Sequence, residues 1–311
     1  MEPDASARAL IAFMKSLNHP ALEDCDIERA RSLSNVARAQ LQPPAPDIAQ
    51  VEDVIAATLE ARIPIRIYRD GAARMPDTAM IFFHGGGFAL GDIEGYDIFC
   101  RQMARAIGCT ILSVEYRRAP EHKFPAAVLD AVAATRWVFE HSEALAIDAK
   151  KIILCGDSAG GNLAAVASIL LRGDTRERIA LQVLLYPVTD HANGYPSKER
   201  LAEGYLLSKA AMDYYARLYF SDPAHAADWR ASPALAPDLV GLPEALVITA
   251  GFDPLVDEGE AYALRMSQFG NTVTLKRYPG QVHGFMTRAK LVPEAASAMG
   301  DVAAFVNAKL G

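Results

Sequence analysis

The sequence predicts an α/β fold with a mainly parallel central sheet flanked by helices. Short apolar runs alternate along the chain with longer segments whose apolar residues recur at helical spacing. Several of the short runs are apolar at nearly every position, which is typical of parallel strands covered on both faces. We therefore expect a sheet of about eight strands.

The expected elements follow in chain order. The N-terminal segment is predicted to be helical over 9–17 and 26–41, and the sequence PPAP ends the second helix. Apolar runs predict strands, two of them within 54–69 and then one each at 79–84, 109–116, 151–155, 181–188, 244–250 and 272–278. Amphipathic or apolar runs predict helices at 124–142, 159–172, 258–270 and 293–310. Gly270 stands at the end of its helix, where a left-handed cap favours glycine.

One segment interrupts this alternation. Residues 191–240 are rich in Pro, Tyr and Ser and contain a helix-like stretch over 208–220. This segment is interpreted as an insertion between two strands. The sheet would then be built from 46–190 and 241–311, with the helices of 1–45 preceding it.

Composition narrows the classes of partner. The chain has 311 residues, 51% of them hydrophobic, and a formal net charge of −7, with no basic run of the kind that binds phosphate. Nucleic acid is therefore not an expected partner. The N-terminus lacks a signal-peptide pattern and no apolar run approaches a membrane span, so we expect a cytoplasmic protein without stable membrane insertion. Four cysteines without CxxC spacing are expected to be reduced, buried thiols: Cys25, Cys100, Cys109 and Cys155.

The stretch GDSAG places Ser158 between a predicted strand and a predicted helix. A sharp strand-to-helix turn of this type presents a serine nucleophile, and it needs neighbours with almost no side chain. The helix that begins there also offers unpaired N–H groups. The alternative is an ordinary glycine-rich turn. Asp157, beside the serine, is expected to have a structural role.

The stretch HGGGF begins at His84, directly after a predicted strand. Three glycines allow the backbone to approach a ligand and to turn N–H groups toward it, as an oxyanion hole requires. The alternatives are a flexible loop or a phosphate cradle, but a phosphate loop would carry a lysine where Phe88 stands. His84 is expected to hold the loop rather than to act as a base.

A serine nucleophile needs a base and a group that orients the base. Asp253 and His283 each follow a late predicted strand, so the chain order is Ser158, Asp253, His283, which is the order in α/β-hydrolases. Asp190 is a less favoured alternative to Asp253. Two further acidic residues, Asp257 and Glu258, are expected to stabilise a helix N-terminus. The remaining histidines are expected in helical or polar surface contexts: His19, His122, His141, His191 and His225.

Together these motifs resemble the bacterial hormone-sensitive-lipase-like esterases of the α/β-hydrolase fold, in the group carrying GDSAGG. The matching stretches are HGGGF, EYRRAPEHKFPAA, GDSAGGNLAA, DPLVDEGEAYA and HGF, and the resemblance runs from about residue 50 to the C-terminus. This chain departs mildly from the family at Arg118, Lys123 and Val256. The resemblance implies a helical cap formed by 1–45 and 191–240, and the dimer contacts that the family often uses.

The resemblance also implies the roles of individual residues. It implies a catalytic triad of Ser158, Asp253 and His283, and an oxyanion hole formed by the backbone N–H groups of Gly85, Gly86 and Ala159. We therefore expect a serine carboxylesterase for short- to medium-chain acyl esters, with no metal or cofactor. Candidates to line the substrate pocket are Phe88, Tyr195, Leu206, Leu207 and Tyr214. The alternatives are a hydrolase acting on amides, lactones or drug-like esters, and a non-catalytic receptor like those for plant gibberellins, which lack the histidine.

Overall fold

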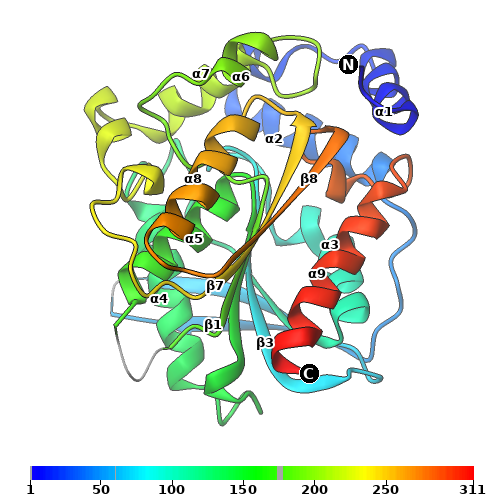
Figure 1. The fold of residues 1–311 in the computed structure, drawn as a ribbon. Helices are drawn as coiled ribbons and strands as arrows, with labels where there is room; N and C mark the ends of the chain where they lie inside the picture. The colour runs from blue at the N-terminus through cyan, green and yellow to red at the C-terminus, as the bar shows by residue number, and fades with distance from the viewer. Residues whose placement is uncertain (1, 60, 174–177) are drawn as a thin grey trace.

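The computed structural model describes residues 2–59, 61–173 and 178–311. Within these ranges eight strands form one sheet, in the order β1-β2-β4-β3-β5-β6-β7-β8 (Figure 1). β2 is antiparallel to β1 and β4, and the other neighbouring pairs are parallel, which confirms the predicted sheet. The strands are β1 (Gln50–Ala57), β2 (Arg62–Arg69), β3 (Met75–Phe83), β4 (Cys109–Val114), β5 (Ile152–Asp157), β6 (Leu181–Leu185), β7 (Glu244–Phe252) and β8 (Val273–Val282).

Helices cover both faces of the sheet. In Figure 1, α3 and α9 lie together on one face, and α4, α5 and α8 lie on the other. The α-helices are α1 (Ala5–Ser16), α2 (Ile27–Leu41), α3 (Ile93–Ile107), α4 (Ala126–Glu140), α5 (Ala159–Leu171), α6 (Pro196–Arg200), α7 (Lys209–Tyr219), α8 (Val256–Gln268) and α9 (Glu294–Leu310). No helix in the described part of the chain is both long enough and apolar enough to cross a bilayer.

Helix α3 is not among the elements expected from the sequence. The side chain of Asp92 caps its first turn by accepting the N–H of Gly95 at 2.6 Å, and Gly108 ends it with a left-handed φ of 79°. An aspartate before a helix and a glycine after it are ordinary boundary residues. These two residues were therefore a usable signal for the missed helix.

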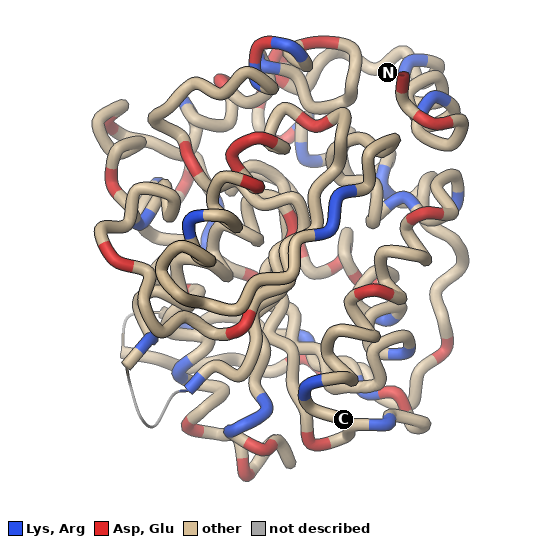
Figure 2. Tube along the Cα trace, viewed as in Figure 1, with Lys and Arg blue, Asp and Glu red and all other residues tan. Residues whose placement is uncertain are grey.

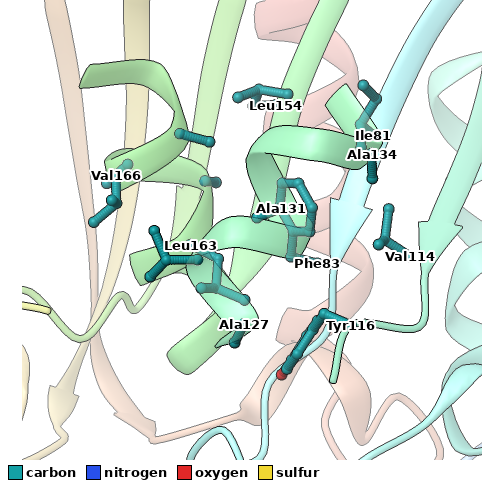
Figure 3. Close-up of a cluster of buried hydrophobic side chains, with 14 of the residues drawn as sticks. Ile81, Phe83, Val114, Tyr116, Ala127, Ala131, Ala134, Leu154, Leu163 and Val166 are labelled. Carbon is teal, nitrogen blue, oxygen red and sulfur yellow. The ribbon is translucent and has the colours of Figure 1, made fainter. Parts of the chain in front are cut away.

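Alternate side chains of β3 enter two different hydrophobic clusters. Ile81 and Phe83 belong to the cluster shared with α4 and α5, part of which is shown in Figure 3. Met80 and Phe82 belong to the cluster shared with α3 and α9. Because both faces of the strand are buried, it is apolar at consecutive positions, and each fully buried side chain of this size stabilises the fold by roughly 1.5–3 kcal/mol.

Charged residues are interspersed over the view shown in Figure 2. Several form exposed ion pairs; Arg66, for example, lies 2.7 Å from both Asp53 and Glu94. Pairs of this kind contribute about 0–1 kcal/mol each, so buried apolar contacts dominate the stability. Three cysteines are buried free thiols as expected, whereas Cys25 is partly exposed.

The N-terminal helices and the segment 191–240 lie near one another. In Figure 1, α1, α2, α6 and α7 are at the same end of the molecule as the carboxyl ends of β7 and β8. Side-chain contacts join the two segments: Tyr214 of α7 donates to the carbonyl of Cys25 at 3.3 Å, and Ser208 donates to Glu23 at 3.4 Å. Segments far apart in the sequence therefore meet over the end of the sheet where parallel strands usually carry a site.

Candidate active site

Ser158 occupies a strained turn between β5 and α5. Its φ is 55° and its ψ is −117°. Residues other than glycine rarely adopt this backbone conformation, which costs about 1–3 kcal/mol of folding free energy. The glycines on either side are sterically required. A Cβ on Gly156 would collide with the backbone of Gly160, and a Cβ on Gly160 would collide with the carbonyl of Phe83. The sequence thus folds into the tight turn that presents the serine hydroxyl.

Two later strand ends bring Asp253 and His283 to this serine. His283 Nε2 lies 2.9 Å from Ser158 Oγ, and His283 Nδ1 lies 2.6 Å from Asp253 Oδ2. A second oxygen of Asp253 accepts the N–H of Leu255 at 2.8 Å, which fixes the carboxylate. The three side chains predicted from strand ends and chain order therefore form one hydrogen-bonded chain.

The partners of His283 select its tautomer. The Asp253 carboxylate accepts a hydrogen bond from Nδ1–H, so the unprotonated Nε2 is left as the acceptor for the serine hydroxyl. Asp253 is fully buried, and the side chain of His283 retains 13% exposure. The imidazole thus has one side fixed inside the protein and the other directed at Ser158.

The competing carboxylates have other partners. Asp190 accepts hydrogen bonds within its own turn, from Ala192, Asn193 and Tyr195. Asp190 forms no hydrogen bond to His283 within the described residues, so the structure does not support it as the orienting carboxylate.

Asp257 and Glu258 have different roles from each other. Asp257 accepts the N–H of Ser197 at 2.8 Å. Glu258 is completely buried, accepts the N–H of Thr189 at 2.7 Å, and lies 2.6 Å from Lys198 Nζ. Burial raises the pKa of Glu258 to about 7. Both residues are in the first turn of α8, as expected, but Glu258 also joins α8 to the segment 191–240.

Two other histidines are not on the open surface: His84 is buried, and His191 is partly buried where it lines the cavity. His84 is buried, stacks on Tyr116 with ring centroids 4.4 Å apart, and contacts the carbonyl of Gly85 through Nδ1 at 2.9 Å. Burial lowers its pKa to about 3, so the ring is neutral, which suits the expected loop-holding role. His191 does not fit the expectation of a surface context. It packs edge-on against Phe220, and burial lowers its pKa to about 4.

The prediction that Gly85 donates to the oxyanion is wrong, because its N–H group has other partners. The N–H of Gly85 donates to Asp157 Oδ1 at 2.7 Å and to the hydroxyl of Tyr96 at 3.1 Å. It is therefore already paired and is not available to a ligand over Ser158. Asp157 Oδ2 accepts the Tyr96 hydroxyl at 2.9 Å, so Asp157 links the serine turn to the loop, as its expected structural role requires.

Gly86 and Gly87 line the cavity and, among the described residues, have unpaired N–H groups, unlike Gly85. Gly86 and Gly87 have positive φ values of 126° and 60° and line the cavity over the serine. In the described ranges their N–H groups have no hydrogen-bond acceptor. Ala159 is the first residue of α5, so its N–H has no partner within the helix.

A cavity of about 700 Å³ lies over Ser158 and His283. Three of the predicted pocket residues line it, namely Phe88, Leu206 and Leu207. The prediction is wrong for Tyr195 and Tyr214, which do not line it.

Instead of lining the cavity, Tyr195 and Tyr214 form hydrogen bonds with other residues. Tyr195 donates to Asp190 at 3.1 Å, and Tyr214 donates to the carbonyl of Cys25. Tyr215 and Tyr219 line the cavity instead. One residue along α7 turns a side chain by about 100°, so the face could not be chosen from composition alone.

A family model described as alpha/beta hydrolase fold matches residues 80–287, and the chain belongs to this family. It is 39% identical over 238 residues to the ethyl acetate hydrolase of Pseudomonas putida, covering 75% of this chain and 74% of that protein. It is 35% identical over 274 residues to the carboxylesterase NlhH of Mycobacterium tuberculosis, covering 85% and 86%.

Solved structures agree with this assignment. An ester hydrolase from the metagenome of Lake Arreo, complexed with a bipyridine phosphonate derivative, superposes with a TM-score of 0.94 at 36% identity over 99% of both chains. An esterase of the archaeon Pyrobaculum calidifontis gives a TM-score of 0.91 at 37% identity, again over 99% of both chains. These relatives confirm the resemblance to hormone-sensitive-lipase-like esterases and place the chain among carboxylic ester hydrolases.

Proposed function

We propose that this chain is a serine carboxylesterase in which Ser158 is the nucleophile, His283 the base and Asp253 the residue that orients the base. The observation that carries the proposal is the hydrogen-bonded chain of 2.9 Å and 2.6 Å that joins these side chains at the floor of a cavity. The names of the relatives, which include an ethyl acetate hydrolase and a carboxylesterase, support the same chemistry.

The reaction begins when Ser158 Oγ forms a bond to the ester carbonyl carbon and its proton passes to His283 Nε2. The tetrahedral intermediate collapses, the alcohol leaves, and it takes the proton from Nε2. Water then attacks the acyl carbon and gives a proton to His283, and Ser158 Oγ takes that proton as the carboxylic acid is released. Asp253 holds Nδ1–H and stabilises the imidazolium formed in each half of the cycle.

The negative charge of each tetrahedral intermediate is stabilised by the N–H groups of Gly86, Gly87 and Ala159. This set replaces the expected one, because the N–H of Gly85 is already paired with Asp157. Support comes from the cavity position and unpaired N–H groups of the two later glycines. One such donor typically contributes about 10²–10³ in rate.

The cap, defined as residues 1–45 and 191–240, closes the substrate cavity. Residues of α2, α7 and the loop before α7 line the cavity together with Ser158, which supports this role. A cavity of about 700 Å³ has room for an acyl chain of short to medium length. Phe88, Leu206 and Leu207 contact that chain.

The proposal is tested with para-nitrophenyl esters of increasing acyl length. We expect the purified protein to hydrolyse the butyrate ester, with activity falling for long acyl chains. Ser158→Ala and His283→Ala should each lose nearly all turnover while keeping the circular dichroism spectrum of the wild type. Wild-type turnover in either variant would overturn the assignment of the nucleophile or the base.

A further inference from the structure

Two arginines line the cavity over Ser158 without a carboxylate partner. Arg38 comes from α2, and Arg288 lies directly after the short helix η5 (Phe285–Thr287). No carboxylate oxygen of the described residues lies within 4.0 Å of either guanidinium. Two lysines of the same cavity are paired: Lys198 lies 2.6 Å from Glu258, and Lys209 lies 3.2 Å from Asp213. Lys15 also lines the cavity and has no carboxylate partner among the described residues, but it is exposed, whereas the two unpaired arginines are partly buried.

Two of the three guanidinium nitrogens of Arg38 have no hydrogen-bond partner among the described residues. Its guanidinium carbon lies 3.9 Å from the centroid of the Tyr96 ring, so it stacks on an aromatic face. Its Nε and Nη1 are shielded from solvent and have no hydrogen-bond partner among the residues described. Buried N–H groups without an acceptor are destabilising, and an oxygen acceptor brought in by a ligand would relieve this.

Arg288 has a partly used guanidinium. Its Nη1 donates to the carbonyl of Gly284, and the carbonyl of His283 lies at 3.4 Å. Within 2–59, 61–173 and 178–311, its Nε and Nη2 form no hydrogen bond. Burial, followed by the charge of Arg38, lowers the pKa of Arg288, so the two guanidinium groups are close enough to repel.

Two nearby carboxylates, Asp157 and Asp92, act electrostatically on Arg38. The oxygens of Asp157 already accept from Gly85 and Tyr96, and those of Asp92 accept from Asn35 and Gly95. The carboxylate of Asp253 is engaged by His283. None of these carboxylates accepts a hydrogen bond from Arg38 or Arg288, so in the described part of the chain the two guanidinium groups have no directly bound carboxylate.

We propose that Arg38 and Arg288 form an anion subsite that selects ester substrates carrying a second, ionised carboxylate. This inference rests on the proposed esterase function and names its substrate class. A carboxylate fits because its two oxygens match the paired N–H groups of a guanidinium, and its negative charge is attracted by both guanidinium groups. The substrates are half-esters of dicarboxylic acids, or esters whose alcohol part carries a carboxylate.

The test compares matched pairs of esters that differ only in the anionic group. On the acyl side, para-nitrophenyl hexanoate is compared with the mono-para-nitrophenyl ester of adipate. On the alcohol side, para-methylphenyl butyrate is compared with para-carboxyphenyl butyrate. For each pair the ratio of kcat/KM, anionic over neutral, is measured in the wild type and in variants. A general loss of activity or of folded protein affects both esters equally and therefore cancels in this ratio.

Arg38 is the residue to change, because Arg288 also holds the backbone next to His283. We expect Arg38→Gln to lower the ratio by about 10- to 100-fold for at least one ester pair, since it removes a charged hydrogen-bond donor. Arg38→Lys should lose less, because it keeps the charge. The control is Arg29→Gln, which makes the same change at an exposed position of the same helix and should leave both ratios unchanged.

A binding measurement separates this inference from the esterase proposal. The affinity of adipate, measured by calorimetry with no turnover, should fall in Arg38→Gln and not in Arg29→Gln. If neither neutral ester is hydrolysed by the wild type, the esterase proposal fails, and adipate binding alone decides whether the anion subsite exists. If Arg38→Gln leaves both ratios and the adipate affinity unchanged, the anion subsite is overturned, whatever the activity on neutral esters.

Discussion

Asp157 accepts the backbone N–H of Gly85 at 2.7 Å, and this hydrogen bond joins the turn that holds Ser158 to the glycine loop. The two residues are 72 positions apart in the chain. Tyr96 completes the link by donating to the other oxygen of Asp157. The pairing takes Gly85 out of the set of possible oxyanion donors and sets where Gly86 and Gly87 lie relative to the serine.

Removing this link should affect turnover more than substrate affinity. In Asp157→Ala the N–H of Gly85 loses its buried acceptor, which costs about 1–3 kcal/mol of stability, and the loop is no longer held against the serine turn. We expect kcat to fall at least about tenfold with a smaller change in KM, because transition-state donors are displaced. Asp157→Asn keeps an acceptor oxygen, so its kcat should lie between that of the wild type and that of Asp157→Ala. An unchanged kcat in Asp157→Ala would show that the loop holds its position without Asp157.

Gly160 should tolerate no side chain. The added Cβ of Gly160→Ala would collide with the carbonyl of Phe83, and overpacking of this kind costs about 3 kcal/mol or more when backbone must move. Gly300→Ala is the matched control, because a Cβ there meets open space within α9. It should be neutral or stabilise by up to about 1 kcal/mol. Urea unfolding of the two variants checks this, and equal stabilities would contradict the packing described for the turn.

His84 should make the fold sensitive to acid. Burial lowers its pKa to about 3 from an ordinary 6.5, so below pH 6.5 the unfolded chain binds a proton that the folded chain does not. The contribution of His84 to the free energy of unfolding is therefore fully present above pH 6.5 and is lost as the pH falls toward 3. Between pH 6.5 and 5 the loss is roughly 2 kcal/mol.

Comparing variants at several pH values isolates this effect. His84→Gln cannot bind the proton, so its unfolding free energy relative to the wild type should rise as the pH is lowered from 7 to 5. His122→Gln changes an exposed histidine and should follow the wild type throughout. Parallel pH curves for the wild type and His84→Gln would contradict the neutral, buried state of His84.

Asp253 should be the carboxylate on which turnover depends. In Asp253→Asn the amide favours the wrong imidazole tautomer, and we expect kcat to fall by about 10³–10⁴-fold with the fold retained. Asp257→Asn is the control, since Asp257 accepts the N–H of Ser197 rather than contacting His283. Measured kcat values that fall equally in both variants would move the orienting role away from Asp253.

The sequence could predict the sheet and the meeting of Ser158, Asp253 and His283 because local rules determine them. Apolar runs mark strands buried on both faces, and parallel strands that end at one edge bring their following residues together. The chain order then restricts the combination to one familiar arrangement. None of these steps needs a side-chain contact that spans the chain.

The features missed by the sequence depend on contacts between distant segments. Which glycine of HGGGF donates is decided by the pairing of Gly85 with Asp157, and this pairing becomes visible only when the loop and the turn are placed together. The choice of Tyr215 over Tyr214 depends on how α7 is rotated over the cavity. Similarly, the burial of Glu258 depends on Lys198 of the inserted segment.

The most direct test of the central claim is covalent labelling of the serine. A fluorophosphonate should add one phosphonyl group to the wild type, map to the peptide that contains Ser158, and abolish ester hydrolysis in proportion to labelling. Ser34→Ala, which changes another serine of the same cavity, should label like the wild type, and Ser158→Ala should not label. Labelling that persists in Ser158→Ala, or full hydrolysis by that variant, would contradict the account.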